Sequence, residues 1–213
     1  MENQVLLYQN TIKLPDVFNQ EHIKKMLQTL EDSQDYPDND FGRWEKCRDK
    51  SLLMTMFNLA LRPKEACKLK FEDFNFFEAT VKICGINNKT RKDRVIPIPK
   101  DLIPFYHEYF SFDRAYFWKG SPYLFPSAQN EFLSPSSWKR IMRDKILKPA
   151  GIYHVGKTRS YTLRHTRATE ILNKSKDLFL VSNLLGHSKL DSTKVYLHKN
   201  PTYMNYMRSM LDS

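Results

Sequence analysis

The sequence predicts an α+β domain that is mainly helical and contains a small antiparallel β-hairpin. Three observations support this fold class. Apolar residues recur at helical spacing in several segments, two short strand-like segments flank a polar turn, and no internal repeat or linker divides the chain. The chain has 213 residues, 41% of them hydrophobic, which is enough to build a sizeable core.

The first predicted helix follows a short lead-in, residues 1–10. It begins after Leu14-Pro15-Asp16, and a loop rich in Asp and Asn, residues 33–40, ends it. Its apolar residues approximate one face of a helix: Phe18, Ile23, Met26, Leu27 and Leu30.

A second helix is predicted from Asp49, which is expected to be its N-cap. Residues 52–61 are apolar on nearly every side, as expected of a helix buried at the centre of a domain. Pro63 is suited to the first turn of the next helix, which is expected to run to Leu69 with Arg62 at its positive end.

The predicted strands cover residues 80–84 and 95–98, after an aromatic turn over residues 71–77. The connection between the strands, residues 85–94, contains four Lys or Arg residues and therefore predicts a basic hairpin tip.

The remainder of the chain is predicted to be mainly helical. A loop is expected over residues 121–135, and Gly186 is expected to end a helix. Asp191 or Ser192 would cap the segment that carries Tyr196. The helices are predicted over residues 100–116, 136–147, 163–173 and 178–185.

The positive net charge of the chain favours an anionic partner. The formal net charge is +10, which suits nucleic acid, although an acidic membrane surface would attract the same charge. No apolar run approaches the roughly 18 residues of a membrane span, and the N-terminus lacks the features of a signal peptide. We therefore expect a cytoplasmic protein that associates with DNA.

The cysteines Cys47, Cys67 and Cys84 suggest neither a disulfide framework nor a zinc site. They are odd in number, and none of their spacings matches a Cys-x-x-Cys pair. We expect reduced thiols, no metal site and no cofactor.

Four residues supply the side chains that a metal-free attack on a phosphodiester requires. Arg62 and Arg164 can offset charge, His187 can carry a hydrogen bond or a proton, and Tyr196, nine residues after His187, can hold a covalent link. Each of these residues is common in proteins. Their order and sequence context together indicate the reaction.

From about Leu14 to about Tyr203, the chain resembles the catalytic domain of the tyrosine recombinase family, which includes phage integrases and Xer resolvases. The resemblance lies in Leu61-Arg62-Pro63-Lys64-Glu65, in Tyr161-Thr162-Leu163-Arg164, in Leu185-Gly186-His187 and in Tyr196. Lys89 stands eight residues before Pro97, the spacing that the family's hairpin lysine keeps.

The resemblance implies site-specific DNA recombination or integration through a 3'-phosphotyrosine on Tyr196, without metal or ATP. Arg62 and Arg164 would bind the non-bridging phosphate oxygens. Lys89 would protonate the leaving 5'-oxygen, and His187 would bind the phosphate or help to take up the tyrosine proton.

Other residues have weaker assignments. Tyr161 stands where the family usually has histidine or another polar group; it either donates a hydrogen bond to phosphate or packs before a helix. Glu65 either holds Arg62 or Arg164 in place or is a surface helix residue. The predicted DNA-binding residues are Thr90, Arg91, Lys92, Arg94 and Arg167.

The domain expectation is a catalytic domain over residues 11–213, without the N-terminal core-binding domain that family members usually carry. Its C-terminal tail, residues 201–213, would dock either on the same chain or on a neighbour. The expected partner is double-stranded DNA. A homotetramer is expected on DNA, and a monomer is compatible with the free state.

Two other functions use the same residues. A type IB topoisomerase would relax DNA with a related arginine, lysine, histidine and tyrosine set. A non-catalytic DNA-binding module would keep the fold without the reaction, but binding alone does not require Tyr196.

Overall fold

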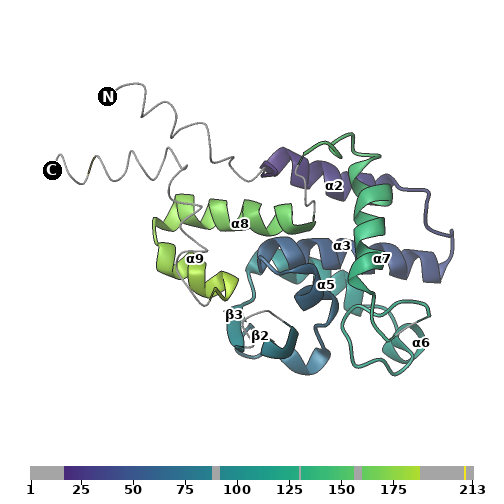
Figure 1. Cartoon of the computed structure of the whole chain (residues 1–213). Helices are drawn as coiled ribbons and strands as arrows, with labels where there is room; N and C mark the ends of the chain where they lie inside the picture. Colours follow the sequence, from purple (N-terminus) through teal and green to yellow (C-terminus); the bar gives the residue numbers. More distant parts are fainter. Residues whose placement is uncertain (1–16, 88–91, 130, 156–159, 188–208, 210–213) are drawn as a thin grey trace.

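The computed structural model of the chain is mainly helical, and its small sheet lies at the lower edge of the molecule in Figure 1, next to the helix near the C-terminal end of the described chain. The structure describes residues 17–87, 92–129, 131–155, 160–187 and 209.

Two long helices form the N-terminal part. Helix α2 (Gln20–Asp32) begins at its N-cap Asn19 and buries the apolar face that the sequence predicts. Helix α3 (Asp40–Asn58) is capped by the side chain of Asn39, which accepts the backbone N–H of Gly42. Most of α3 from Cys47 onward is buried, so this helix is the centre of the domain.

The prediction that Asp49 caps a helix is wrong. Asp49 lies in the middle of α3, is fully buried, and accepts hydrogen bonds from the Tyr36 hydroxyl (2.8 Å) and from Arg48 (3.0 Å). A buried ion pair therefore stands where the sequence suggested a helix start. The preceding turns of α3 are rich in charged residues, which hid their helical periodicity.

Helix α4 (Pro63–Cys67) has Pro63 in its first turn and Arg62 as its N-cap, as predicted, but it ends before Leu69. The turn η1 (Phe71–Asp73) leads to a three-stranded antiparallel sheet in the order β1 (Phe74–Asn75), β2 (Thr80–Ile83), β3 (Arg94–Pro97). The predicted strands are confirmed to within a residue, whereas β1 was not predicted. The turn η2 (Gly85–Asn87) follows β2.

The predicted helix over residues 100–116 is broken. The turn η3 (Lys100–Leu102) leads into α5 (Ile103–Phe110), and a separate helix α6 (Arg114–Trp118) begins at its N-cap Asp113. Helix α7 (Pro135–Ile141) continues into the π-helical segment η4 (Met142–Leu147).

The last two described helices place the candidate site. Helix α8 (Ser160–Ser175) begins three residues before the predicted start, so its first turn includes Tyr161. Helix α9 (Leu178–Leu185) ends as predicted at Gly186, which has a left-handed backbone with φ of 62°. The predicted caps Asp191 and Ser192 lie outside the described residues.

The core has a large and a small part. The large part packs α3 against α2 and α5 and also includes the buried side chains of the sheet, with an aromatic group around Trp44, Tyr109 and Trp118. The small part joins α8 and α9 to the end of α3 (Figure 1). Its members are Ala60, Ala168, Leu172, Val181 and Leu185.

None of the helices in the described ranges is long and apolar enough to cross a membrane.

Candidate functional site

A buried carboxylate, Glu65, lies at the centre of three arginines. Its Oε1 accepts hydrogen bonds from Nη1 of Arg62 (3.0 Å) and Nη1 of Arg94 (2.9 Å). Its Oε2 accepts the backbone N–H of Arg62 (2.8 Å) and Nη2 of Arg94 (3.1 Å). Nη1 of Arg164 lies 3.7 Å from the same Oε2. Glu65 is therefore buried and paired with Arg62, and the alternative of a surface helix residue is excluded.

The local sequence explains how Arg62 and Glu65 meet. Pro63 starts α4 with a fixed φ and no N–H, which leaves Arg62 as the N-cap and Glu65 as the third helical residue. A glutamate at that position reaches back to the N–H of the N-cap residue, as Glu65 does here. The fold of this short segment thus brings one arginine onto the carboxylate.

Arg164 is held by main-chain carbonyls from two distant segments. Its Nη1 donates to the carbonyl of Ala60 (2.8 Å), and its Nη2 donates to the carbonyl of Leu185 (2.6 Å). Ala60 has a left-handed backbone, with φ of 51°, at the turn after α3. Only 4% of the Arg164 side chain is exposed, so its orientation is fixed by the protein.

His187 lies beside Arg164. Its Nε2 is 3.4 Å from Nη2 of Arg164, and its backbone N–H donates to Ser182 just after the left-handed Gly186. Partial burial, followed by the charges of Arg164, Arg62 and Arg94, lowers the pKa of His187 to about 4. The imidazole is therefore neutral at neutral pH.

Glu65 remains ionised despite its burial. Burial alone raises its pKa, but the hydrogen bonds and charge of Arg94, the Arg62 N–H and the charge of Arg164 together hold the pKa below its usual value. One negative charge thus stands among three positive ones.

Arg94, one of the predicted DNA-binding residues of the hairpin, is directed into the protein. Arg94 is the first residue of β3, its side chain is 9% exposed, and it points to Glu65 and to the carbonyl of Leu184 (3.0 Å). The register of β2 and β3 accounts for this inward orientation. Arg94 pairs with the buried Ile83 and stands two residues before the buried Ile96, so all three belong to one face of the sheet.

Arg167 is also largely engaged within the protein. Its Nη1 pairs with Glu170 (3.2 Å), its guanidinium lies over the ring of Phe57, and only 19% of its side chain is exposed. Lys92 and Tyr161, in contrast, are exposed. Of the predicted DNA-binding residues that the structure describes, Lys92 is thus the most accessible.

Several predicted site residues lie outside the described residues. They are the proposed nucleophile and three residues of the hairpin connection: Tyr196, Lys89, Thr90 and Arg91. The structure therefore brings together Arg62, Glu65, Arg164 and His187 and adds Arg94 to them.

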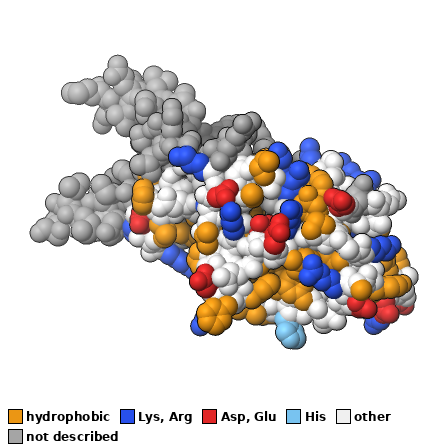
Figure 2. All heavy atoms as spheres, turned by 90° about the horizontal axis from the view of Figure 1, so that it is seen from below, with side chains coloured by type: hydrophobic (Ala, Val, Ile, Leu, Met, Phe, Trp, Pro, Cys, Tyr) orange, Lys and Arg blue, Asp and Glu red, His pale blue; other side chains and the backbone are white. Residues whose placement is uncertain are grey.

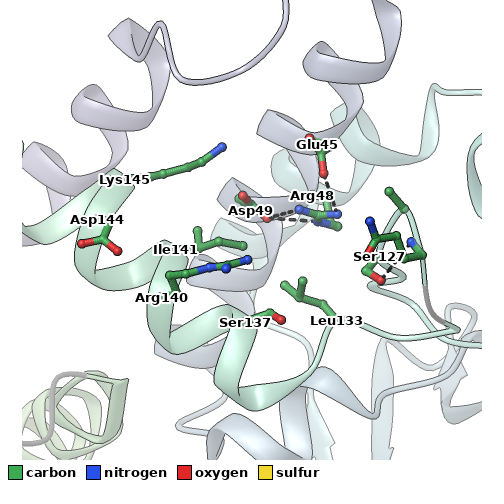
Figure 3. Close-up of a pocket in the computed structure, with 12 residues that line it drawn as sticks. Glu45, Arg48, Asp49, Ser127, Leu133, Ser137, Arg140, Ile141, Asp144 and Lys145 are labelled. Carbon is green, nitrogen blue, oxygen red and sulfur yellow. Dashed lines mark hydrogen bonds and ion pairs between the residues drawn. The ribbon is translucent and has the colours of Figure 1, made fainter.

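A separate pocket of about 460 Å³ opens between α3, α7, the π-helical segment η4 and the loop residues Ser127, Ala128, Gln129 and Leu133 (Figure 3). Its lining includes the buried pair Arg48 and Asp49 from α3, together with Arg140 from α7 and Asp144 and Lys145 from η4 (Figure 3). None of its lining residues belongs to the arginine cluster around Glu65.

On the face seen from below Figure 1, the charged side chains that the structure describes do not gather into a patch of one sign. Figure 2 shows basic, acidic and hydrophobic side chains interspersed there, rather than one basic patch. Within the described part of the chain, no group of three His, Cys, Asp or Glu residues is arranged to hold a metal ion.

The cluster can bind and polarise a phosphate. Arginine forks suit phosphate oxygens, and donors fixed in advance at a partly buried site stabilise charge that develops during a reaction. Arg62 and Arg164 are fixed by Glu65 and by main-chain carbonyls, and the neutral imidazole of His187 lies beside them. This arrangement suits a phosphoryl-transfer site.

Comparisons with known sequences agree on one protein family. Residues 16–202 match the model of the phage integrase family. Tyrosine recombinase XerA of Pyrococcus furiosus is 32% identical over 186 residues, which cover 86% of this chain and 57% of that protein. Tyrosine recombinase XerD of Pseudomonas aeruginosa is 34% identical over 155 residues, covering 71% and 49%. The chain thus spans about half the length of these curated relatives.

Solved structures share the fold. A XerA recombinase crystal structure has a TM-score of 0.71 at 22% identity, covering 94% of this chain and 66% of that one. The structure of XerH recombinase bound to its difH substrate has a TM-score of 0.72 at 25% identity, covering 93% and 55%.

Proposed function

This chain belongs to the phage integrase family, and we propose that it is a site-specific DNA recombinase that cuts and rejoins strands through Tyr196. The observation that carries the proposal is the arginine cluster. Arg62 and Arg164 are held beside a neutral His187, in the positions that the family resemblance gives to the phosphate-binding residues.

In the proposed reaction, the Tyr196 oxygen attacks a backbone phosphorus, and the bond from phosphorus to the 5'-oxygen breaks. Arg62 and Arg164 offset the charge that builds on the non-bridging oxygens. Lys89 delivers a proton to the departing 5'-oxygen. A 5'-hydroxyl from a partner strand then reverses these steps, so the phosphotyrosine link is exchanged for a new phosphodiester without ATP.

The lowered pKa of His187 sets its protonation state at the start of the proposed reaction. Because its pKa is held near 4, it is neutral when the reaction begins and can accept a hydrogen bond or a proton from Tyr196, or donate one hydrogen bond to the phosphate. Tyr161 lies in the exposed first turn of α8 and is proposed as a further hydrogen-bond donor to DNA.

Double-stranded DNA is the proposed partner, and the formal charge of +10 supports it. The hairpin residues Thr90, Arg91 and Lys92 are proposed to contact the DNA backbone, with Arg167 beside them. A homotetramer on DNA and a cytoplasmic location are part of the same proposal, with a C-terminal segment that contacts a neighbouring protomer.

Covalent capture tests the reaction. The protein is incubated with nicked duplexes that carry candidate sites, because loss of the short fragment beyond the nick traps the covalent complex. We expect a denaturant-resistant protein–DNA adduct that the Tyr196→Phe variant does not form.

Tyr203→Phe is the matched control, since it removes a nearby hydroxyl from the same part of the sequence and should keep the adduct. Absence of an adduct on DNA that the protein demonstrably binds would contradict the proposal and favour a binding module. Relaxation of a supercoiled plasmid by wild type but not by Tyr196→Phe would indicate strand rotation.

A further inference from the structure

We propose that Arg94 is a positioning residue of the reaction and not a DNA contact. It occupies and neutralises the Glu65 carboxylate, so that Arg164 is not drawn onto that carboxylate and Arg62 meets it only through Nη1 and its backbone N–H. Both arginines can then act on a phosphate. The inference rests on the proposed function, because it assigns a task to Arg62 and Arg164 there.

The hydrogen bonds of Glu65 support this assignment. An ionised carboxylate offers about four lone-pair positions. Arg94 fills one on each oxygen, and Arg62 fills the other two with its Nη1 and its backbone N–H. Arg164 lies 3.7 Å away, beyond a hydrogen bond, and its guanidinium donates to two main-chain carbonyls instead.

The charges lead to the same conclusion. Three guanidinium groups around one carboxylate leave a net charge of about +2 at a site that must meet a phosphate. Without Arg94, the same carboxylate would cancel half of the charge of the two remaining arginines, and two of its lone pairs would compete for their donors.

The position of Arg94 excludes an outward role. Its Nε donates to the carbonyl of Leu184 at the end of α9, and its guanidinium packs against Gly186. A Cβ on Gly186 would come within 3.0 Å of Nη1 of Arg94. Arg94 thus ties β3 to α4 and α9, the two helices whose ends carry Arg62 and His187.

A double-mutant cycle between the two residues tests the proposal. The variants are Arg94→Gln, Glu65→Gln and the double variant. Each is assayed for the rate of covalent adduct formation on the nicked duplex at saturating DNA, and for DNA affinity across a series of salt concentrations. Lys92→Gln is the comparison, because Lys92 is an exposed cation close to Arg94 in sequence.

We expect Arg94→Gln to slow adduct formation about tenfold or more, as is typical when a coupled residue of a site is lost. Its salt dependence of DNA binding should match wild type, whereas Lys92→Gln should lower the slope of log affinity against log salt by up to roughly 0.9. The double variant should react faster than Arg94→Gln, because the unneutralised carboxylate is gone.

Two results would overturn the proposal. One is a salt slope for Arg94→Gln that falls as it does for Lys92→Gln, which would place Arg94 on a phosphate. The other is a rate for the double variant that equals the product of the two single losses. If Arg94→Gln does not fold, Arg94→Lys keeps the charge, and it should show a smaller rate loss with an unchanged salt slope.

The failures of the two proposals are distinguishable. If wild type forms no adduct on DNA that it binds, the recombinase proposal fails. The salt slopes then still decide whether Arg94 touches DNA, because they need no cleavage.

Discussion

The imidazole of His187 responds to acid in a way set by its neighbours. Burial and the charges of Arg164, Arg62 and Arg94 lower its pKa to about 4, against an ordinary value of 6.5. We expect an NMR titration of the histidine ring protons to show one midpoint near pH 4 that is absent in His187→Gln. A single set of midpoints near 6.5 would contradict this geometry.

The lowered pKa of His187 also makes the stability of the fold depend on pH. Between about pH 6.5 and about pH 4, the unfolded chain binds a proton on this histidine and the folded chain does not. The free energy of unfolding should therefore fall as the pH drops through this window, and it should fall less in His187→Gln. Urea denaturation at several pH values measures the difference.

At the level of single residues, the sequence predicted some members of the arginine cluster and missed others. Arg62, Arg164 and His187 were predicted from motif spacing, and the structure brings them together. The orientation of Arg94 was missed because its basic neighbours favoured an exposed loop. Its partner Glu65 lies 29 residues away, and only the strand register places the two side chains together.

Gly186, which follows helix α9, contacts the arginine cluster through the side chain of Arg94. Gly186 has a left-handed backbone, and an added Cβ would lie 3.0 Å from Nη1 and 3.1 Å from Cδ of Arg94. Gly186→Ala should therefore combine a conformational cost of about 1 kcal/mol with displacement of Arg94, and should also slow adduct formation. Denaturant unfolding and the adduct assay measure the two effects.

Gly151→Ala is the matched control. Gly151 has a similar φ of 67°, and an added Cβ would meet nothing within 4 Å. It should show the conformational cost alone and normal adduct formation. Equal losses of stability and activity in both variants would show that the contact between Gly186 and Arg94 is unimportant.

Helices and strands with clear periodicity were predicted well, and those with conflicting local signals were not. Gly186 ends α9, and β2 and β3 lie within a residue of their predicted bounds. Asp49 was mistaken for a cap because the sequence does not reveal that it is buried, where it pairs with the neighbouring Arg48 and accepts a hydrogen bond from Tyr36. The π-helical end of α7 has no distinct sequence signal.

For the whole molecule, the proposed assembly on DNA can be tested through the C-terminal segment. A chain truncated after Pro201 should form fewer tetramers on DNA than the full chain if that segment contacts a neighbouring protomer. Analytical ultracentrifugation with a labelled duplex measures this. Tetramer formation unchanged by the truncation would mean that the segment docks on its own chain or is not needed.

Arg164 reaches across the chain to the carbonyl of Ala60, 104 residues earlier in the sequence, and to that of Leu185. A ribosome adds about 5–20 residues per second, so roughly 5–20 s separate the synthesis of Ala60 from that of Arg164. Arg62 and Glu65 emerge before Arg164, but the cluster cannot close until the end of α9 has followed. A nascent chain therefore has no complete arginine cluster until Leu185 has been made.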